Sequence, residues 1–361
     1  MINIGVIGAG LYGRVHLDTF TQREKQVGDA RVAAFADLNE SARKAAEKDF
    51  GVKGYASVEE MLANEELDGV TVVTPDHLHH KLVMACLEAG KNVFVEKPLS
   101  TDIREAVEMA EKAEAKNLLL QVDFHKRFDP YHIDLKLRIR DGELGTVQYG
   151  YCWMEDVLRV GTDMIGQAHW GQSGSPAWFL GIHMIDLSYW LMDFPEPVKV
   201  YATGGQGKLK SLGRDIYDSV KANVTYTNGA TVTYDTAVIL PNSHEAVVRQ
   251  GVKMVGTEGF LVVDSQYRGA RGCSTAEGMR TPNCGGFGRK IAKNGEIVKV
   301  GYINESLLDF VENLTELKKG ATAADMAGKY ASAREGIVST RIGVAIHKSL
   351  ESGGLVDMKE L

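Results

Sequence analysis

The sequence predicts an α/β unit with a parallel sheet, followed by a unit built on an antiparallel sheet. Short apolar runs alternate with helical segments as far as residue 122, which is typical of a parallel sheet with right-handed crossovers. From residue 198 apolar residues recur at every second position instead, as in a sheet with one covered face. At roughly 150 residues per domain, 361 residues favour two domains.

In the first part, five helices are expected between five strands. The apolar runs that predict strands are 2–7, 32–36, 70–73, 92–95 and 118–122. The segments with helical spacing are 11–20, 41–50, 80–89 and 103–116, and a capping pattern at Ser57-Val58-Glu59-Glu60 marks one further helix start.

The second part contains a hairpin signal. Residues 220–226 and 232–238 alternate with period two, and the intervening Asn228-Gly229 is the strongest short hairpin signal. Helical spacing returns at 179–192, 305–318 and 327–350. The Gly-rich stretch 267–289 lacks periodicity, so we expect a long surface loop or an oligomer contact.

Composition excludes several classes of protein. Lys plus Arg is 41 and Asp plus Glu is 48, so the net charge of −7 makes nucleic acid an unexpected partner. No apolar run reaches the ~20 residues that cross a bilayer, and the first residues lack the basic start of a signal peptide. The four scattered cysteines fit free thiols in a reducing cytoplasm, although a bridge or metal at Cys273 and Cys284 stays open.

A glycine-rich loop joins the first strand to the first helix. In Gly8-Ala9-Gly10-Leu11-Tyr12-Gly13, the first glycine can make the tight turn and Gly10 can let the backbone approach a pyrophosphate. Gly13 can let the helix pack closely, and the N–H groups at the helix start attract phosphates. The loop therefore predicts a dinucleotide site that includes Leu11 and Tyr12.

Asp37 ends the second strand, 24 residues after Gly13, where an acidic residue can bind the adenosine ribose. A carboxylate would repel a 2′-phosphate, and neither Leu38 nor Asn39 supplies a compensating cation. We therefore expect NAD rather than NADP. The alternative is a tight turn followed by a surface aspartate.

Two further loops leave the same edge of the predicted sheet. Thr74-Pro75 precedes a cluster of histidines that includes His79, whose spacing does not match a usual zinc pattern, so we expect no metal and a cofactor-side loop instead. Glu96-Lys97-Pro98 ends the next strand. Beside a cationic nicotinamide the ammonium form of Lys97 is disfavoured, so its amine could exchange a proton with a substrate hydroxyl. A solvated surface lysine is the alternative.

Together these motifs resemble the glucose–fructose oxidoreductase / inositol dehydrogenase / rhizopine catabolism (Gfo/Idh/MocA) family. The resemblance rests on the motifs above and on two later segments, Gln121 to Pro130 and Gly181 to Asp186. It implies an N-terminal Rossmann domain (1–124), and then a substrate-binding and oligomerisation α/β domain (125–361) with a large, mostly antiparallel sheet. It also implies a homodimer or homotetramer assembled through that sheet.

The resemblance assigns roles to individual residues. It implies that Lys97 is the catalytic lysine and that His183 binds or deprotonates the reacting hydroxyl. We expect substrate contacts from Arg127, Glu155, Phe179 and Asp186. The positions expected to bind the cofactor are Gly8, Gly10, Leu11, Tyr12, Gly13, Asp37, Thr74, Pro75, His79, Glu96, Lys97 and Gln121.

Some of these positions have structural alternatives. His183 and Asp186 share a helix face, so a structural hydrogen bond between them is equally open from spacing alone. Arg127 could form a surface ion pair, and Phe179 could belong to the core rather than stack on a sugar.

Three positions depart from the family pattern. Many members carry an aspartate four residues before the histidine, where this chain has Phe179. Asp123 stands where glycine is usual and His125 where a neutral residue is usual. These changes leave the cofactor hypothesis intact but alter the expected substrate geometry.

The favoured hypothesis is an NAD-dependent dehydrogenase that acts on a secondary alcohol of a sugar, cyclitol or sugar derivative, or on the corresponding ketone. One alternative retains NAD in a redox-neutral reaction, such as oxidation-assisted glycoside cleavage or epimerisation. Another is a non-catalytic NAD(H)-binding regulator.

Overall fold

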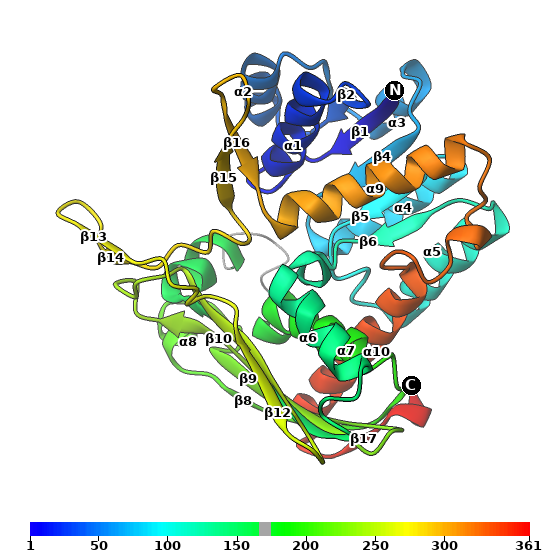
Figure 1. Ribbon diagram of the computed structural model, residues 1–361. Helices are drawn as coiled ribbons and strands as arrows, with labels where there is room; N and C mark the ends of the chain where they lie inside the picture. The colour runs from blue at the N-terminus through cyan, green and yellow to red at the C-terminus, as the bar shows by residue number, and fades with distance from the viewer. Residues whose placement is uncertain (166–174) are drawn as a thin grey trace. The chain divides into compact units, whose positions relative to one another are not determined.

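A computed structural model describes residues 1–165 and 175–361 (Figure 1). The chain forms two compact units, Met1–His125 with Arg289–Ile337, and Lys126–Gly288 with Val338–Leu361. This division differs from the expected 1–124 and 125–361, because the segment 289–337 contributes to the first unit. The expected helix at 305–318 is amphipathic, and its apolar face packs in the N-terminal core.

The first unit is built on a six-stranded parallel sheet with the strand order β3-β2-β1-β4-β5-β6. Every adjacent pair is parallel, and Val6 at its centre lies opposite both Phe35 and Thr71. The order brings the carboxyl ends of β1, β4 and β5 side by side. Its strands are β1 (Ile2–Ile7), β2 (Ala30–Ala36), β3 (Gly54–Tyr55), β4 (Gly69–Val72), β5 (Asn92–Val95) and β6 (Leu120–Val122).

Helices connect and cover these strands. The expected cap at Ser57 is confirmed, since its hydroxyl accepts a hydrogen bond from the Glu60 N–H at 3.1 Å. The first helix begins at Gly13 rather than Leu11. The helices of this unit are α1 (Gly13–Gln26), α2 (Glu40–Phe50), α3 (Val58–Asn64), α4 (His79–Glu88), α5 (Ile103–Ala115) and α9 (Tyr302–Lys318), with short turns η1 (Asp76–Leu78), η2 (His125–Phe128, shared with the second unit) and η6 (Ala324–Met326).

Helix α9 completes the core of the first unit although it follows in sequence after most of the second. Leu307, Phe310 and Leu314 are buried in one apolar cluster with Ile4 of β1 and Leu17 of α1. The α9 side chains lie so close to β4 that a Cβ on Gly69 would be 2.7 Å from Leu314. The core of this unit is therefore shared between two distant stretches of chain.

The second unit contains a seven-stranded sheet with the order β12-β11-β7-β10-β9-β8-β17. Its pairs are antiparallel except β7 with β10, which run parallel. The expected large, mostly antiparallel sheet is thus confirmed. Its strands are β7 (Val147–Val157), β8 (Pro197–Gly205), β9 (Ser219–Tyr226), β10 (Thr231–Leu240), β11 (Val248–Gly256), β12 (Phe260–Asp264) and β17 (Val356–Asp357).

The hairpin predicted at Asn228-Gly229 joins β9 and β10. Thr225 lies opposite Thr231, and Gly229 adopts φ +85°, which suits glycine in such a turn. The helical elements of this unit are α6 (Pro130–Arg140), η3 (Val160–Ile165), η5 (Ala177–Gly181), α7 (Ile182–Leu191), α8 (Lys208–Ser211), α10 (Ala333–Ser352) and η7 (Met358–Glu360), with the first turns of α10 in the first unit.

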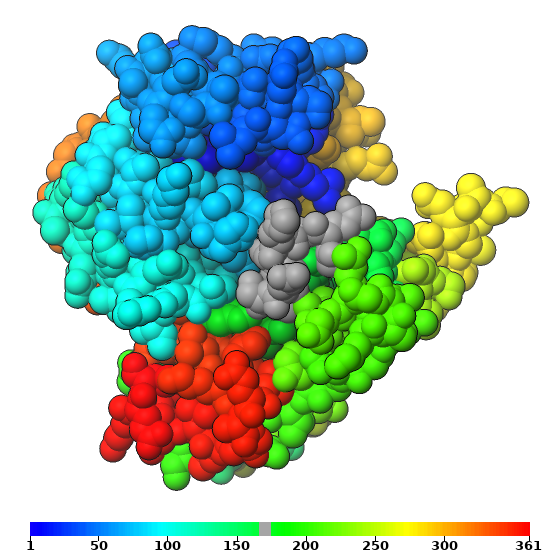
Figure 2. Space-filling view, turned by 180° about the vertical axis from the view of Figure 1, so that it is seen from behind, coloured from blue at the N-terminus to red at the C-terminus, as the bar shows by residue number. Residues whose placement is uncertain are grey.

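The segment 267–289 is more ordered than the expected loop. It contains the hairpin β13 (Gly272–Ser274) and β14 (Gly278–Arg280), which extends from the second unit in both views, in yellow (Figures 1 and 2). A second hairpin, β15 (Gly288–Ile291) with β16 (Ile297–Val300), follows it. Cys273 and Cys284 are exposed free thiols.

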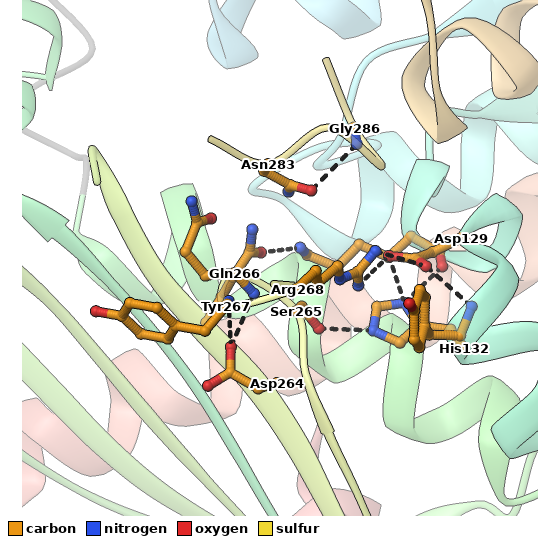
Figure 3. Close-up of polar contacts among 12 residues, drawn as sticks. Asp129, His132, Asp264, Ser265, Gln266, Tyr267, Arg268, Asn283 and Gly286 are labelled. Atoms are coloured by element: carbon orange, nitrogen blue, oxygen red, sulfur yellow. Dashed lines mark hydrogen bonds and ion pairs between the residues drawn. The ribbon is translucent and has the colours of Figure 1, made fainter. Parts of the chain in front are cut away.

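Polar contacts anchor the start of this segment to helix α6 (Figure 3). Both terminal nitrogens of Arg268 donate to the Asp129 carboxylate, at 3.0 and 2.5 Å. His132 of α6 lies 2.8 Å from the Ser265 hydroxyl, and Gln266 donates to the Thr281 carbonyl. The exposed hairpin β13–β14 is therefore preceded by a segment that buried hydrogen bonds hold against the second unit.

Within the described residues, no helix combines the length and the apolar character that crossing a bilayer requires.

Candidate functional site

The glycine loop has the geometry that its three glycines predict. Gly8 adopts φ +99°, and a Cβ there would lie 2.2 Å from the Val73 carbonyl oxygen. A Cβ on Gly13 would lie 2.0 Å from the Gly8 carbonyl oxygen. A Cβ on Gly10 would meet nothing within 4 Å. Gly8 and Gly13 are thus required by the fold itself, whereas Gly10 leaves open space beside the backbone.

The rest of the loop offers further groups to a dinucleotide. Leu11 is 75% exposed beside Gly10, at the N-terminal end of α1. Tyr12 directly precedes that helix, and its hydroxyl is buried without a hydrogen-bond partner among the described residues. The open backbone at Gly10, next to a helix N-terminus, fits an anionic pyrophosphate.

Asp37 lies against this loop at the end of β2. Its carboxylate accepts hydrogen bonds from the Ala9 N–H at 2.7 Å and from the Asn39 N–H at 2.8 Å. The fold also brings a cation here, because the Arg43 guanidinium donates to the Asp37 carbonyl oxygen at 2.8 Å. The expectation of no nearby cation rested on the two residues after Asp37 and missed this arginine, which lies one helical turn further along α2.

The loop after β4 is braced by a buried histidine. The two ring nitrogens of His79 lie 2.8 Å from the Pro98 carbonyl oxygen and 2.9 Å from the Thr74 carbonyl oxygen. His79 thereby links the turn that contains Thr74 and Pro75 to the turn after β5. The Thr74 hydroxyl is buried without a partner among the described residues, so it could bind a ligand at this edge.

Lys97 lies in the turn after β5, where the Lys97–Pro98 peptide bond is cis. The preceding residue, Glu96, is buried, and its N–H donates to the Val72 carbonyl of β4 at 3.0 Å. Gln121 is fully buried in β6. Its amide donates to Asp309 and accepts from Asn313, both on α9. The Gln121 amide therefore links β6 to α9 through hydrogen bonds within the first unit.

The residues expected to contact substrate lie in the second unit. His183 and Asp186 are one turn apart on the buried helix α7. The Arg127 guanidinium donates to both oxygens of the Asp186 carboxylate, at 2.9 and 2.5 Å, and both side chains are buried. The structure thus pairs two of the predicted substrate ligands with each other, as a buried rather than a surface ion pair.

Phe179 and Glu155 occupy different surroundings. Phe179 packs against an apolar cluster that includes Val160, Leu180 and Val238, so its position offers no polar group. Glu155 lies on β7 opposite Arg249 of β11 and forms an ion pair with it. The alternative that assigned Phe179 to the core agrees with this packing.

Comparison with known proteins identifies the family. Residues 2–124 match the oxidoreductase family with an NAD-binding Rossmann fold, and residues 132–262 match the Gfo/Idh/MocA C-terminal domain. The chain belongs to the Gfo/Idh/MocA family. Its first unit contains the NAD-binding Rossmann domain of this oxidoreductase family.

The similarity to known relatives extends over most or all of the chain. It is 26% identical to a myo-inositol 2-dehydrogenase from Thermotoga maritima, over 100% of this chain and 99% of that one. It is 28% identical to an inositol 2-dehydrogenase from Rhizobium meliloti, over 78% of this chain and 81% of that one. Scyllo-inositol dehydrogenase from Lactobacillus casei, solved with NAD(H) and scyllo-inositol, shares the fold with a TM-score of 0.80 at 20% identity, over 99% of each chain.

Proposed function

We propose that this protein is an NAD-dependent dehydrogenase that transfers hydride between the nicotinamide and a secondary alcohol of a cyclitol or sugar. The observation that carries the proposal is the open backbone at Gly10, on the same sheet edge as the Lys97 turn. Parallel sheets bind their ligands at the carboxyl ends of the strands, so that edge is where a dinucleotide and a lysine would act together. The inositol dehydrogenases among the relatives favour a cyclitol.

The residues of the first unit fit a nicotinamide dinucleotide. The N–H groups of the loop at Gly10 and Leu11 would hold the pyrophosphate, and Asp37 would accept hydrogen bonds from the adenosine ribose. The negative charge of Asp37 favours NAD, although Arg43 lies close enough to offset part of it. Once bound, the cofactor supplies the hydride chemistry, and the protein supplies position and electrostatics.

We assign proton transfer to Lys97. Its amine would accept the proton of the reacting hydroxyl in the oxidation direction and return it in the reduction direction. His183, on α7 of the second unit, is proposed to contact a substrate hydroxyl. The ion pair between Arg127 and Asp186 would fix the helix that carries His183, which is a positioning role rather than direct substrate binding.

A panel of inositols, sugars and sugar acids, incubated with the protein and NAD, tests the proposal. We expect NADH to accumulate with at least one cyclitol or sugar. Product formation without net NADH would instead support the redox-neutral alternative. That alternative stays open because apolar Phe179 stands where many members of the family carry an aspartate. Tight NAD binding without any product across the panel would support a non-catalytic regulator.

The second sheet supports a proposed homodimer or homotetramer. Tyr149, Val255 and Phe260 lie in register across β7, β11 and β12, and Tyr149 and Phe260 are exposed, at 49% and 64%. Val262 on β12 is exposed as well. Aromatic and apolar residues gathered on one sheet face are typical of a protein interface.

A further inference from the structure

A buried polar cluster lies in the interior of the first unit, on elements that adjoin the glycine loop and the Lys97 turn. A ring nitrogen of His16 and one carboxyl oxygen each of Glu96 and Asp123 all lie within 4.8 Å of one another. His16 and Asp123 are 0% exposed, and Glu96 is 8% exposed. The three residues come from α1, the end of β5 and the end of β6, so the cluster joins three elements at the ligand-binding edge.

Two of these groups are carboxyl groups held close to each other. Carboxyl oxygens of Glu96 and Asp123 lie within 4.8 Å of each other, and both residues are buried. Like charges this close in a buried site cannot both persist without a cation between them. The contact therefore requires either one proton or a metal ion.

The surroundings of the pair place its negative charge on Asp123. One Asp123 oxygen accepts a hydrogen bond from the Ser306 hydroxyl of α9 at 2.7 Å, and the other lies 3.3 Å from Nδ1 of His125. Oε1 of Glu96 has no hydrogen-bond partner among the described residues, and the donor that acts on the Glu96 carboxyl is the Lys97 backbone N–H. Asp123 thus has side-chain partners at both of its oxygens, whereas Glu96 has no such partner at Oε1.

Electrostatics agree with this placement. Burial, the charge of Asp123 and the hydrogen bond with Asp123 raise the pKa of Glu96 well above its usual range, although the nearby Lys97 opposes the rise. Burial also acts against the charge of Asp123. The charge of His125 and the hydrogen bonds from His125, Glu96 and Ser306 nevertheless lower the pKa of Asp123.

The other titratable groups around the pair come from α1 and α9. Burial lowers the pKa of His16 to about 4, so its imidazole is neutral, and its Nε2 lies 3.4 Å from Glu96 Oε1. Burial, followed by the charges of Asp123 and Glu96, raises the pKa of the Tyr12 hydroxyl. On α9, Tyr302 stacks on His125. These neighbours are consistent with a single negative charge in the pair, on Asp123, and with a neutral Glu96.

We propose that Glu96 is a protonated carboxylic acid that donates its hydrogen bond to the Asp123 carboxylate, and that this one-proton pair positions the turn carrying Lys97. Glu96 precedes Lys97 directly, so a fixed Glu96 side chain restrains the backbone from which the amine extends. The positioning role rests on the proposed dehydrogenase function, whereas the protonation of Glu96 does not. Glu96 is a positioning residue in this proposal, acting through Lys97.

The pair also explains why this chain departs from its family at residues 123 and 125. Asp123 supplies the acceptor for the Glu96 proton, and His125 supplies a donor to Asp123. The two departures therefore belong to one network. A change at either position alone would leave a buried polar group without its partner.

Infrared spectroscopy of the folded full chain at pH 7 tests the protonation directly. The wild-type spectrum should contain the carbonyl stretch of a protonated carboxylic acid, shifted in deuterated water and absent from Glu96→Gln. Asp123→Asn is the matched control and should retain a protonated-acid band. Absence of the band in the wild type, or its loss from Asp123→Asn but not from Glu96→Gln, would overturn the proposal.

Metal analysis of the same purified protein tests whether a metal ion, rather than a proton, lies between the two carboxyl groups. We expect less than stoichiometric zinc, manganese or iron. One tightly bound divalent ion per chain, lost in His16→Gln and Asp123→Asn, would mean that both carboxylates are ionised ligands and would refute a shared proton.

The positioning role is tested by comparing Glu96→Gln with Glu96→Ala in the NADH assay. An amide can still donate to Asp123, so kcat should be about tenfold or more higher in the Gln variant, with similar affinity for NADH in both. The pH dependence of kcat should also shift in Glu96→Ala relative to Glu96→Gln. Equal kcat values and equal pH profiles in the two variants would refute positioning. If no substrate is found, the infrared result still decides the protonation of Glu96.

Discussion

Replacing Gly10 by alanine separates cofactor binding from folding. The backbone of Gly10 lies outside the left-handed region, and an added Cβ would meet no atom within 4 Å. The substitution should therefore leave the free energy of unfolding unchanged or raise it by about 0.4–1 kcal/mol, because alanine restricts the unfolded chain. The added methyl group would instead occupy the space through which a pyrophosphate approaches the backbone.

The size of the binding loss follows from the contacts at risk. A hydrogen bond from a backbone N–H to a charged phosphate contributes about 1.5–3 kcal/mol. Since about 1.4 kcal/mol is a factor of ten in affinity, loss of one such bond should raise the Kd for NADH roughly 10- to 100-fold. Loss of a second bond would increase the effect.

Fluorescence titration with NADH measures the Kd, and thermal unfolding measures stability. Gly272→Ala is the matched control, because that glycine also has open surroundings but lies in the β13 strand. Gly13→Ala gives the opposite contrast: its Cβ would lie 2.0 Å from the Gly8 carbonyl, so it should destabilise the fold itself. Wild-type NADH affinity in a stable Gly10→Ala variant would refute the assignment of the loop.

Four further predictions concern the two units separately. Lys97→Ala should lower kcat by about 10²-fold or more while NADH affinity is retained; unchanged turnover would make Lys97 a surface cation. Asp37→Ser should raise NADP affinity relative to NAD by about tenfold, because the repulsion is removed while Arg43 remains, and an unchanged ratio in competitive titrations would contradict this. Asp186→Ala breaks a buried ion pair and should cost about 3–5 kcal/mol in denaturant unfolding, whereas a loss below about 1 kcal/mol would contradict the buried pairing. Burial lowers the pKa of His132 from 6.5 to about 4, so the unfolded chain takes up a proton first and about 3 kcal/mol of stability should be lost as the pH falls from 6.5 to 4. His132→Gln should not show that component, and parallel stability curves for the two proteins would count against it.

Local patterns predicted the elements that depend on neighbouring residues. The alternation at residues 220–226 and 232–238, with Asn228-Gly229 between them, determines a hairpin from contiguous sequence, and β9 and β10 form it. The cap at Ser57 and the close approach of Gly13 to Gly8 are also local. Each of these depends on backbone geometry within one turn or one strand connection, whereas the approach of Gly8 to Val73 joins β1 to the end of β4.

Contacts between distant residues could not be predicted in this way. The helical period of residues 305–318 shows that one face is buried, but not that Phe310 and Leu314 pack on β4. The parallel pairing of β7 with β10 joins strands separated by more than 70 residues, so no turn signal marks it. The approach of Arg43 to Asp37 is a different case, because the two residues are close in sequence and the turn from β2 into α2 brings them together.

At the candidate site, the sequence identified the chemical groups better than their partners. Arg127 and Asp186 are both expected to contact the substrate, and the fold pairs them with each other, which the spacing alone did not indicate. Glu96 is expected beside the cofactor, and the fold also brings its side chain close to Asp123 in the interior. A charged residue can satisfy its hydrogen bonds with substrate or with protein, and only the fold shows which of these occurs.

The return of α9 to the first core has a practical consequence for protein engineering. A fragment that ended after His125 would lack Leu307, Phe310 and Leu314, and would expose the apolar surface that they cover. Such a truncated chain should aggregate or remain partly unfolded. A chimera that borrows the nucleotide-binding half of this enzyme therefore has to transplant two separate stretches of chain together.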